Sequence, residues 1–183
     1  MRLLFTSLVR PHLEYGNVVW HPYLKRDIEL LEGVQHRATR MVPGFAKLTY
    51  EERLKRMKLP TLVYRRARGD AIEVFKYLHN IYRVDSSHLL PLRDVERLGM
   101  RTRGHRLMLL KRDCSGLLRQ NFFSMRVVNM WNGLPDSVVM SPTVNCFKGR
   151  FDRTNEDRKY RMNWDEYSTD DDSRIRDREE EKD

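Results

Sequence analysis

The sequence predicts a mainly α-helical fold, a small multi-helix bundle with a short β-hairpin near 100–112 and a disordered charged tail. Apolar residues recur close to the helical period in several separate stretches, most clearly between 61 and 82. A Pro-Gly pair at 43–44 closes one such stretch. Beyond 155 almost every residue is charged or polar, so burial cannot offset an ordering entropy of about 1–2 kcal/mol per residue.

The first 20 residues carry a heavy apolar stripe, in which Leu4, Leu8 and Trp20 recur near the helical period. Pro11 lies inside this stripe and lacks a backbone N–H, so we expect a kink or a restart of the helix there. Trp20 requires a deep apolar site and a partner for its indole N–H. We therefore expect the rest of the chain to cover this segment, unless its natural partner is a separate polypeptide.

Local capping signals predict the next three helices. Asp27 is typical of an N-cap, and the helix that follows it ends at Pro43-Gly44. Thr49 and Glu52 have the spacing of a capping box, which predicts a short helix ended by a proline. Thr61 is expected to cap the longest helix, which keeps its apolar period to residue 82.

The remainder of the chain alternates irregular and helical segments. Residues 83–99 indicate an irregular connection, and Gly104 favours a short strand or hairpin around it. Apolar spacing predicts a helix from Leu117 to Trp131. Thr143 is placed to cap a short final helix.

Charge is distributed unevenly along the 183 residues, whose formal net charge is +9. The first 150 residues contain 27 basic and 13 acidic residues, whereas the remainder contains 8 and 13. A basic excess of this size favours a polyanionic partner such as RNA or DNA. The alternative is a soluble basic surface with no specific partner.

Composition narrows the setting of the protein. No stretch of 18 apolar residues occurs and no signal peptide is evident, so we expect neither a membrane span nor a membrane partner. Cys114 and Cys146 have no paired spacing, which favours a reduced intracellular setting, nuclear or cytoplasmic.

Two groups of basic residues are candidates for phosphate contact. Arg65, Arg66 and Arg68 occupy the first turns of a helix, where cations oppose the helix dipole and so favour a role other than helix stability. In an extended segment, alternate residues near 101–112 would project to one side and could follow a phosphate backbone. Alternatively, these side chains lie along apolar surface with solvated heads. The full candidate set is Arg65, Arg66, Arg68, Arg101, Arg103, His105, Arg106, Lys111 and Arg112.

Seven ordered blocks over about 150 residues resemble one known family. The blocks include LVRPHLEYG at 8–16 with VWHP at 19–22, VQHRATR at 34–40, LTYEERL at 48–54 with LPTL at 59–62, YRRARGD at 64–70, RTRGH at 101–105, NFFS at 121–124 with RVVN at 126–129, and RFD at 150–152. Together they are similar to the region downstream of the palm in reverse transcriptases of non-LTR, LINE-type, jockey-like retrotransposons.

This resemblance implies a thumb-like helical region over 1–82, a connection over 83–99, a C-terminal basic segment with two helices over 100–154, and the tail over 155–183. In the family, the thumb holds the template–primer duplex by its backbone. The fingers, palm and endonuclease are missing from this chain. The resemblance therefore implies a fragment, a degenerate element copy or a domesticated derivative.

No catalytic residues are predicted. Family polymerases hold divalent metal with an aromatic-x-Asp-Asp motif, which this chain lacks; Asp170 to Asp172 stand in a polar tail without a strand to position them. His105 and the two cysteines are too scattered for a zinc site. We therefore expect no metal, no cofactor and no small-molecule substrate for this chain.

The leading hypothesis is a non-catalytic, nucleic-acid-binding remnant of a LINE-type reverse transcriptase that grips the template–primer backbone. The alternative is a helical protein-interaction module that completes or binds a polymerase core. The apolar opening segment favours the alternative, and the basic excess favours the first.

Overall fold

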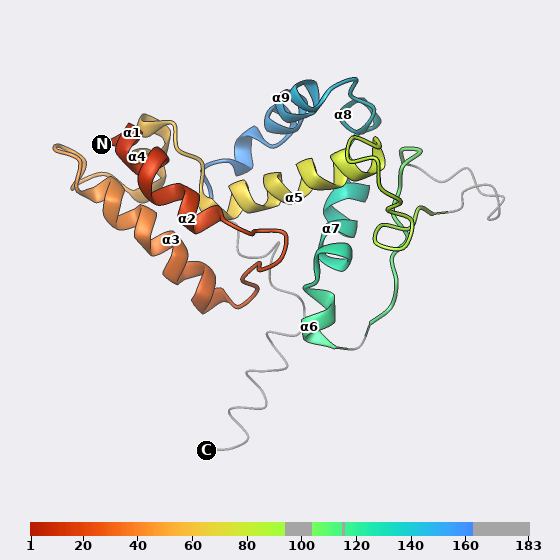
Figure 1. Ribbon diagram of the computed structural model, residues 1–183. Helices are drawn as coiled ribbons and strands as arrows, with labels where there is room; N and C mark the ends of the chain where they lie inside the picture. The colour runs from red at the N-terminus through yellow and green to blue at the C-terminus, as the bar shows by residue number, and fades with distance from the viewer. Residues whose placement is uncertain (94–103, 115, 163–183) are drawn as a thin grey trace, which may run out of the picture. The chain divides into compact units, whose positions relative to one another are not determined.

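The computed structural model describes residues 1–93, 104–114 and 116–162, and its regular structure there is helical, without β-strands (Figure 1). The predicted mainly helical class is confirmed. Among the described residues, one compact unit (unit 1) contains 1–13, 22–63 and 157–162, and a second (unit 2) contains 14–21 and residues from 64 to 156. The division falls inside the longest helix, and so differs from the region boundary expected at 82.

The described residues contain the following helical elements, in order from the N-terminus. They are α1 (Arg2–Leu4), the π-helical turn η1 (Phe5–Val9), α2 (Arg10–Glu14), α3 (Lys25–Arg40), α4 (Tyr50–Met57), α5 (Leu62–Leu78), α6 (Leu117–Gln120), α7 (Phe123–Asn132), α8 (Asp136–Val139), α9 (Val144–Thr154) and the 3₁₀ turn η2 (Glu156–Arg158).

The opening segment stays helical through Pro11, because a π-helical turn precedes it. Leu4 and Arg10, which flank this turn, both keep right-handed helical dihedrals. A π turn shifts the backbone hydrogen bonds by one residue, and so absorbs the irregularity within the helix. The helix therefore does not restart at the proline.

The expectation that the chain covers this apolar segment was wrong. Phe5 is 3% exposed and packs with Leu54, Met57 and Leu59 in the core of unit 1. Leu4 and Leu8, in contrast, are 59% and 63% exposed. Phe5 is thus the main anchor of the segment, because it is the residue of 1–20 that is buried in this core.

Trp20 also differs from the expectation, since its side chain is 41% exposed. Its indole N–H donates to the carbonyl of Tyr15 at 2.5 Å, which provides the predicted partner. The ring lies over Gly16, where an added Cβ would come within 3.2 Å of it. Trp20 therefore closes a local turn and does not fill a deep apolar site.

Helix α3 begins two residues before the predicted N-cap. Leu24 takes the N-cap position without a side-chain hydrogen bond, and Asp27 lies in the first turn, where its charge complements the helix dipole. The buried face of α3 consists of Ile28, Glu32, Gln35 and Thr39, so all but one of its buried residues are polar.

Glu32 organises the polar interior of unit 1. Its carboxylate is 3% exposed and accepts hydrogen bonds from the Leu62 amide at 2.9 Å and from the Tyr50 hydroxyl at 2.5 Å. Gln35 donates to the Tyr50 oxygen and to the Pro60 carbonyl at 3.1 and 3.0 Å. Burial and the adjacent Glu32 charge raise the pKa of Tyr50, so the phenol stays protonated and donates.

Helix α5 begins at Leu62, so Thr61 stands at the predicted N-cap position. The Leu62 amide, the first of α5, donates to the Glu32 carboxylate of another helix. A carboxylate at a helix N-terminus satisfies a free amide and complements the dipole. The helix ends at Leu78, four residues before the predicted end, and Tyr82 is 41% exposed.

Two capping predictions are confirmed. Thr49 and Glu52 form a reciprocal capping box at the start of α4. Thr143 accepts a hydrogen bond from the Cys146 amide at 3.2 Å at the start of α9. Both depend on residues three apart in sequence, which explains why the sequence predicts them.

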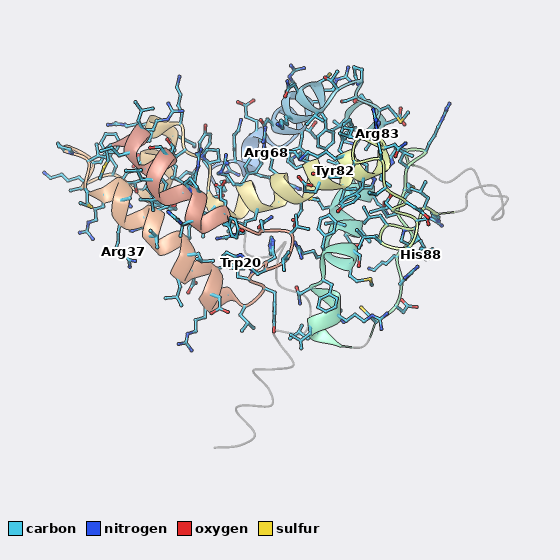
Figure 2. The ribbon with its side chains drawn as sticks, viewed as in Figure 1. Trp20, Arg37, Arg68, Tyr82, Arg83 and His88 are labelled. Carbon is cyan, nitrogen blue, oxygen red and sulfur yellow. The ribbon has the colours of Figure 1, made fainter. Side chains whose placement is uncertain are left out.

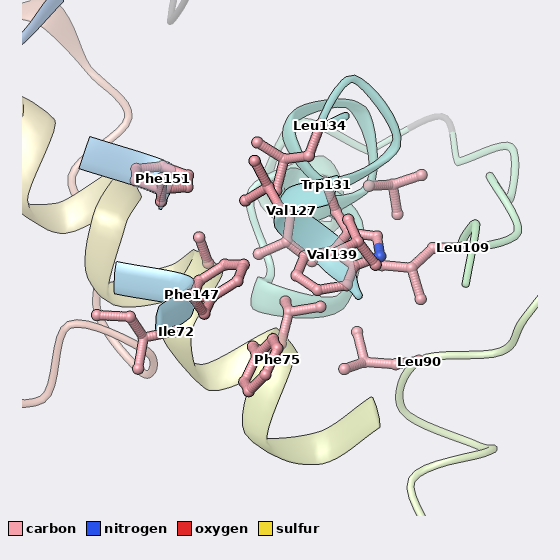
Figure 3. Packing of buried hydrophobic residues seen from close by; sticks show 14 of the residues in the cluster. Ile72, Phe75, Leu90, Leu109, Val127, Trp131, Leu134, Val139, Phe147 and Phe151 are labelled. Carbon is pink, nitrogen blue, oxygen red and sulfur yellow. The ribbon is translucent and has the colours of Figure 1, made fainter. Parts of the chain in front are cut away.

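The core of unit 2 is built on aromatic side chains from α5, α7 and α9 (Figure 3). Phe75 and Phe147 stack with ring centroids 4.5 Å apart, and Trp131 is fully buried. The Trp131 indole N–H donates to the Leu107 carbonyl at 2.7 Å, which fixes the loop before α6 against α7. The loop is fixed again by Asn132, whose side chain bonds both backbone groups of Leu109.

The predicted helix from Leu117 to Trp131 is divided into α6 and α7 by a break at Asn121 and Phe122. The expected hairpin near 100–112 falls partly outside the described residues. Within them, Leu109 forms an isolated antiparallel bridge with Leu92 instead of a strand.

The structure also corrects the start of the predicted tail. Residues 155–162 are described: the Lys159 carbonyl accepts from the Thr61 amide at 3.1 Å, and Tyr160 packs on the core of unit 1. The rest of the predicted tail, 163–183, lies outside the described residues.

Replacement of Glu32 tests the polar interior of unit 1. We expect Glu32→Gln to lower the free energy of unfolding by about 1–3 kcal/mol, because the amide leaves buried donors unsatisfied. Urea denaturation followed by circular dichroism measures the change. Glu29→Gln, at an exposed position of the same helix, should change stability by less than about 0.5 kcal/mol. Equal stability of the Glu32→Gln and wild-type proteins would contradict this role.

Candidate nucleic-acid interface

Two of the predicted phosphate-binding arginines are neutralised by carboxylates of unit 2. The Arg65 guanidinium forms a two-point ion pair with Glu14, in which Nη2 donates to Oε2 at 2.7 Å. Arg68 donates from Nε and Nη2 to the two oxygens of Asp152 at 2.6 and 2.9 Å. Bidentate pairs of this kind are strong and directional, so a phosphate would have to displace a carboxylate from each.

Arg66 and His105 are placed in the interior. Arg66 is 2% exposed and His105 is 3% exposed. His105 Nε2 lies 3.0 Å from the Trp131 carbonyl oxygen, and because a carbonyl only accepts, this nitrogen carries the proton. Neither side chain is positioned to reach a phosphate on the surface.

The basic segment near 101–112 keeps three accessible members. Arg101 and Arg103 lie outside the described residues. Arg106, Lys111 and Arg112 are exposed, and no carboxylate among the described residues pairs with them. This group, Arg106, Lys111 and Arg112, is called the 106–112 cluster below.

A largely buried arginine outside the predicted set, with a side chain 12% exposed, joins three segments of unit 2. Arg126 donates from Nε and Nη2 to Asp70 at 2.9 and 3.1 Å, and from Nη2 to the carbonyls of Asn17 and Val18 at 3.0 and 3.2 Å. Nη1 donates to the Asn121 carbonyl at 3.1 Å, at the break between α6 and α7. This cation is therefore structural, because its donors are occupied by the protein itself.

Asp70 is the acidic partner of this group. Its side chain also accepts from the Asn17 side-chain amide at 3.0 Å. Burial raises the pKa of Asp70, and the hydrogen bond and charge of Arg126 oppose that shift. The pair with Arg126 is what allows a carboxylate to remain in the interior.

His21 lies beside this pair, with Nδ1 3.5 Å from an Asp70 oxygen. Burial lowers the pKa of His21 to about 3, and the charges of Arg126 and Arg66 add to the effect. The imidazole is therefore neutral at pH 7. Its role is to fill the space next to the ion pair without adding a third charge.

Unit 1 holds a group of basic residues outside the predicted set. Arg26, Arg37 and Arg40 are exposed on α3, and within the described residues none of their side chains forms a hydrogen bond or ion pair. Figure 2 shows Arg37 on this helix. Arg26 and Arg37 lie opposite the buried face of the helix, and Arg40 lies to one side of it. Helical periodicity could have located these arginines, because they occupy positions that the apolar spacing leaves outside the core. Three arginines spread over four turns, however, do not stand out as a cluster in the sequence.

The described residues can therefore present exposed cations to an anion. Among them no three His, Cys, Asp or Glu side chains gather where they could hold a metal ion. Helices long and apolar enough to cross a membrane are likewise not found in the described ranges.

Comparisons with protein-family models, with curated proteins and with solved structures find no match to this chain. The similarity to LINE-type reverse transcriptases consequently stays a prediction from the sequence blocks.

The environment of His21 predicts a pH dependence of stability. In the unfolded chain the imidazole titrates near 6.5, whereas in the fold its pKa is about 3, so the unfolded state binds the proton first as pH falls. Stability from this group is complete above pH 6.5 and is lost below it, by up to about 1.4 kcal/mol per pH unit.

The measurement compares urea denaturation of the wild-type protein and His21→Asn at about pH 6.5 and about pH 5. We expect the wild type to lose up to about 2 kcal/mol more than the variant over this interval. Asp70 contributes with the opposite sign in both proteins, so its effect cancels in the difference. Parallel losses in the two proteins would show that His21 is not held neutral by the fold.

Proposed function

We propose that this chain is a non-catalytic, nucleic-acid-binding remnant of a LINE-type reverse transcriptase thumb region. The observation that carries the proposal is the set of exposed basic side chains without carboxylate partners among the described residues, namely the 106–112 cluster of unit 2 and the arginines of α3. Such cations release condensed counterions when they approach phosphates, and this release gives affinity that does not depend on base sequence.

The ion pairs narrow the proposal to fewer residues than the sequence suggested. Arg65 and Arg68 are bound to Glu14 and Asp152, so they contribute little net field at the surface. Arg106, Lys111 and Arg112 keep their full charge in solvent. Phosphate contact in unit 2 is accordingly assigned to the 106–112 cluster.

Binding to a duplex at different salt concentrations tests this function. We expect the wild-type affinity for an RNA–DNA hybrid of about 20 base pairs to fall steeply between about 50 and 200 mM salt, with little dependence on sequence. The double variant Arg106→Gln, Arg112→Gln should reduce the slope of log K against log salt by roughly 1.8, because each phosphate that is no longer neutralised lowers it by about 0.9. Fluorescence anisotropy with a labelled duplex measures both.

The matched control is Arg83→Gln, Arg153→Gln, which removes the same charge from exposed positions elsewhere in unit 2. The control should keep nearly the wild-type slope. Equal wild-type affinities at the two salt concentrations would refute the proposed function. If the two double variants had equal slopes of log K against log salt, the phosphate contacts would have to lie outside the 106–112 cluster.

A second candidate function is supported by one observation in unit 1. The leucines of the opening helix that do not enter the core remain exposed, Leu3 at 80%, Leu4 at 59% and Leu8 at 63%. Contiguous exposed apolar side chains mark protein-interaction surfaces. The partner favoured by the family resemblance is a polymerase core with fingers and palm.

Co-expression with a tagged LINE-type fingers–palm polypeptide tests this second function. We expect Leu4→Glu, Leu8→Glu to reduce recovery of the complex at least about tenfold, because two charges would have to be desolvated in the interface. The control is Leu118→Glu, Phe122→Glu, which alters two residues of unit 2 that are 67% and 62% exposed. No recovery of the wild-type chain, or equal loss in both variants, would exclude this surface as the contact.

A further inference from the structure

The exposed side of α3 carries a defined set of residues. Arg26, Leu30, Gly33 and Arg37 lie opposite the buried Ile28, Glu32, Gln35 and Thr39, as a rotation of about 100° per residue requires, and with Arg40 at their edge they are called the α3 outward face. The face contains three cations. The exposed carboxylates Asp27 and Glu29 border it on either side, and neither forms an ion pair with these arginines.

Gly33 stands in the middle of this face, and packing within the chain does not explain it. A Cβ added at this position would meet only the Arg37 Nη1 atom at 3.9 Å, which is an ordinary van der Waals contact. Alanine would therefore fit, and alanine is favoured over glycine in a helix interior. The helix keeps a residue that weakens it without any compensating contact among the described residues.

We propose that the α3 outward face docks on the sugar–phosphate backbone of a nucleic-acid duplex, with Gly33 as the point of closest approach. This inference rests on the proposed function and assigns it a surface. A residue without a Cβ lets a partner's backbone approach a helix closely. Arg26 and Arg37 are roughly 16 Å apart along the helix axis, so they can reach phosphates at separate points of the duplex backbone.

The composition of the face favours a duplex over other anionic partners. Proteins that hold single strands stack bases on aromatic side chains, and the α3 outward face has none. Protein interfaces depend on buried aromatic or aliphatic anchors, whereas this face offers only Leu30, at 62% exposure. Guanidinium groups with a glycine between them match a rigid, repeating array of phosphates.

The variant Gly33→Ala separates this proposal from a purely structural role, because its two effects have opposite signs. We expect the melting temperature to rise by roughly 3–5 °C, since alanine stabilises the helix. We expect the affinity for the same RNA–DNA hybrid at about 100 mM salt to fall about fivefold or more, because the added methyl group holds the backbone away. Arg37→Gln should also weaken binding and reduce the salt slope by roughly 0.9.

Two controls accompany these variants. Gly149→Ala places a methyl group in the interior of α9 with no atom within 4 Å of it, so it should stabilise the protein and leave binding unchanged. Arg153→Gln removes one exposed charge, as Arg37→Gln does, without altering α3. A single strand of the same length and polyglutamate serve as competitors, and both should displace the duplex only weakly.

The outcomes distinguish this inference from the function on which it rests. If the wild type binds in a salt-sensitive way but Gly33→Ala and Gly149→Ala bind with equal affinity, the α3 outward face is not the binding surface, whereas nucleic-acid binding itself still holds. Loss of salt-sensitive binding in the wild type would remove both. Strong displacement by polyglutamate would assign the face to an acidic protein, and strong displacement by the single strand would assign it to unpaired nucleic acid. Either displacement would overturn the duplex proposal.

Discussion

The ion pair between Arg126 and Asp70, whose side chains are 12% and 4% exposed, is the interaction on which the geometry of unit 2 depends. A single guanidinium holds the carbonyls of Asn17, Val18 and Asn121 while it neutralises a carboxylate on α5. These backbone groups belong to irregular segments, which have no helical partners of their own. Loss of one member of such a pair leaves a buried charge without compensation, a cost of about 3–5 kcal/mol. The 14–21 segment is therefore held on its own unit by this ion pair as well as by the apolar contact of Val18 with the core.

Glu32 has the corresponding role in unit 1. Its carboxylate binds the first amide of α5 and the hydroxyl of Tyr50, so a side chain of α3 links the starts of two other helices. In both units a buried charge satisfies backbone or hydroxyl groups that water cannot reach. The apolar clusters supply most of the burial, and the two ions determine which segments meet. This explains why the apolar opening segment, which looked dominant in the sequence, contributes mainly Phe5 to the core.

The sequence predicted those features that depend on neighbouring residues. The helical class, the Thr49–Glu52 capping box and the Thr143 cap all follow from interactions within one turn, and the structure confirms them. The first amide of α5 is bound by Glu32, which is 30 residues from Leu62, and the break between α6 and α7 is held by Arg126. Helical periodicity contains no information on such partners, so it carried one helix through the break.

A dense run of arginines is a poor guide to a binding surface for the same reason. Arg65 and Arg68 are close in sequence, yet their charges are cancelled by Glu14 and Asp152, which lie 51 and 84 residues away. The arginines of α3 are dispersed in sequence, yet the helix brings them to one side, where none of them forms an ion pair within the described residues. Arg37 and Arg40 are about 5 Å apart along the axis, well inside a screening length of about 8 Å at physiological salt, so their fields add. The positive potential that a ligand meets at the surface depends on whether each cation is already paired with a carboxylate in space. For this chain, unpaired cations favour α3 as the binding surface over α5, which has the densest run of arginines.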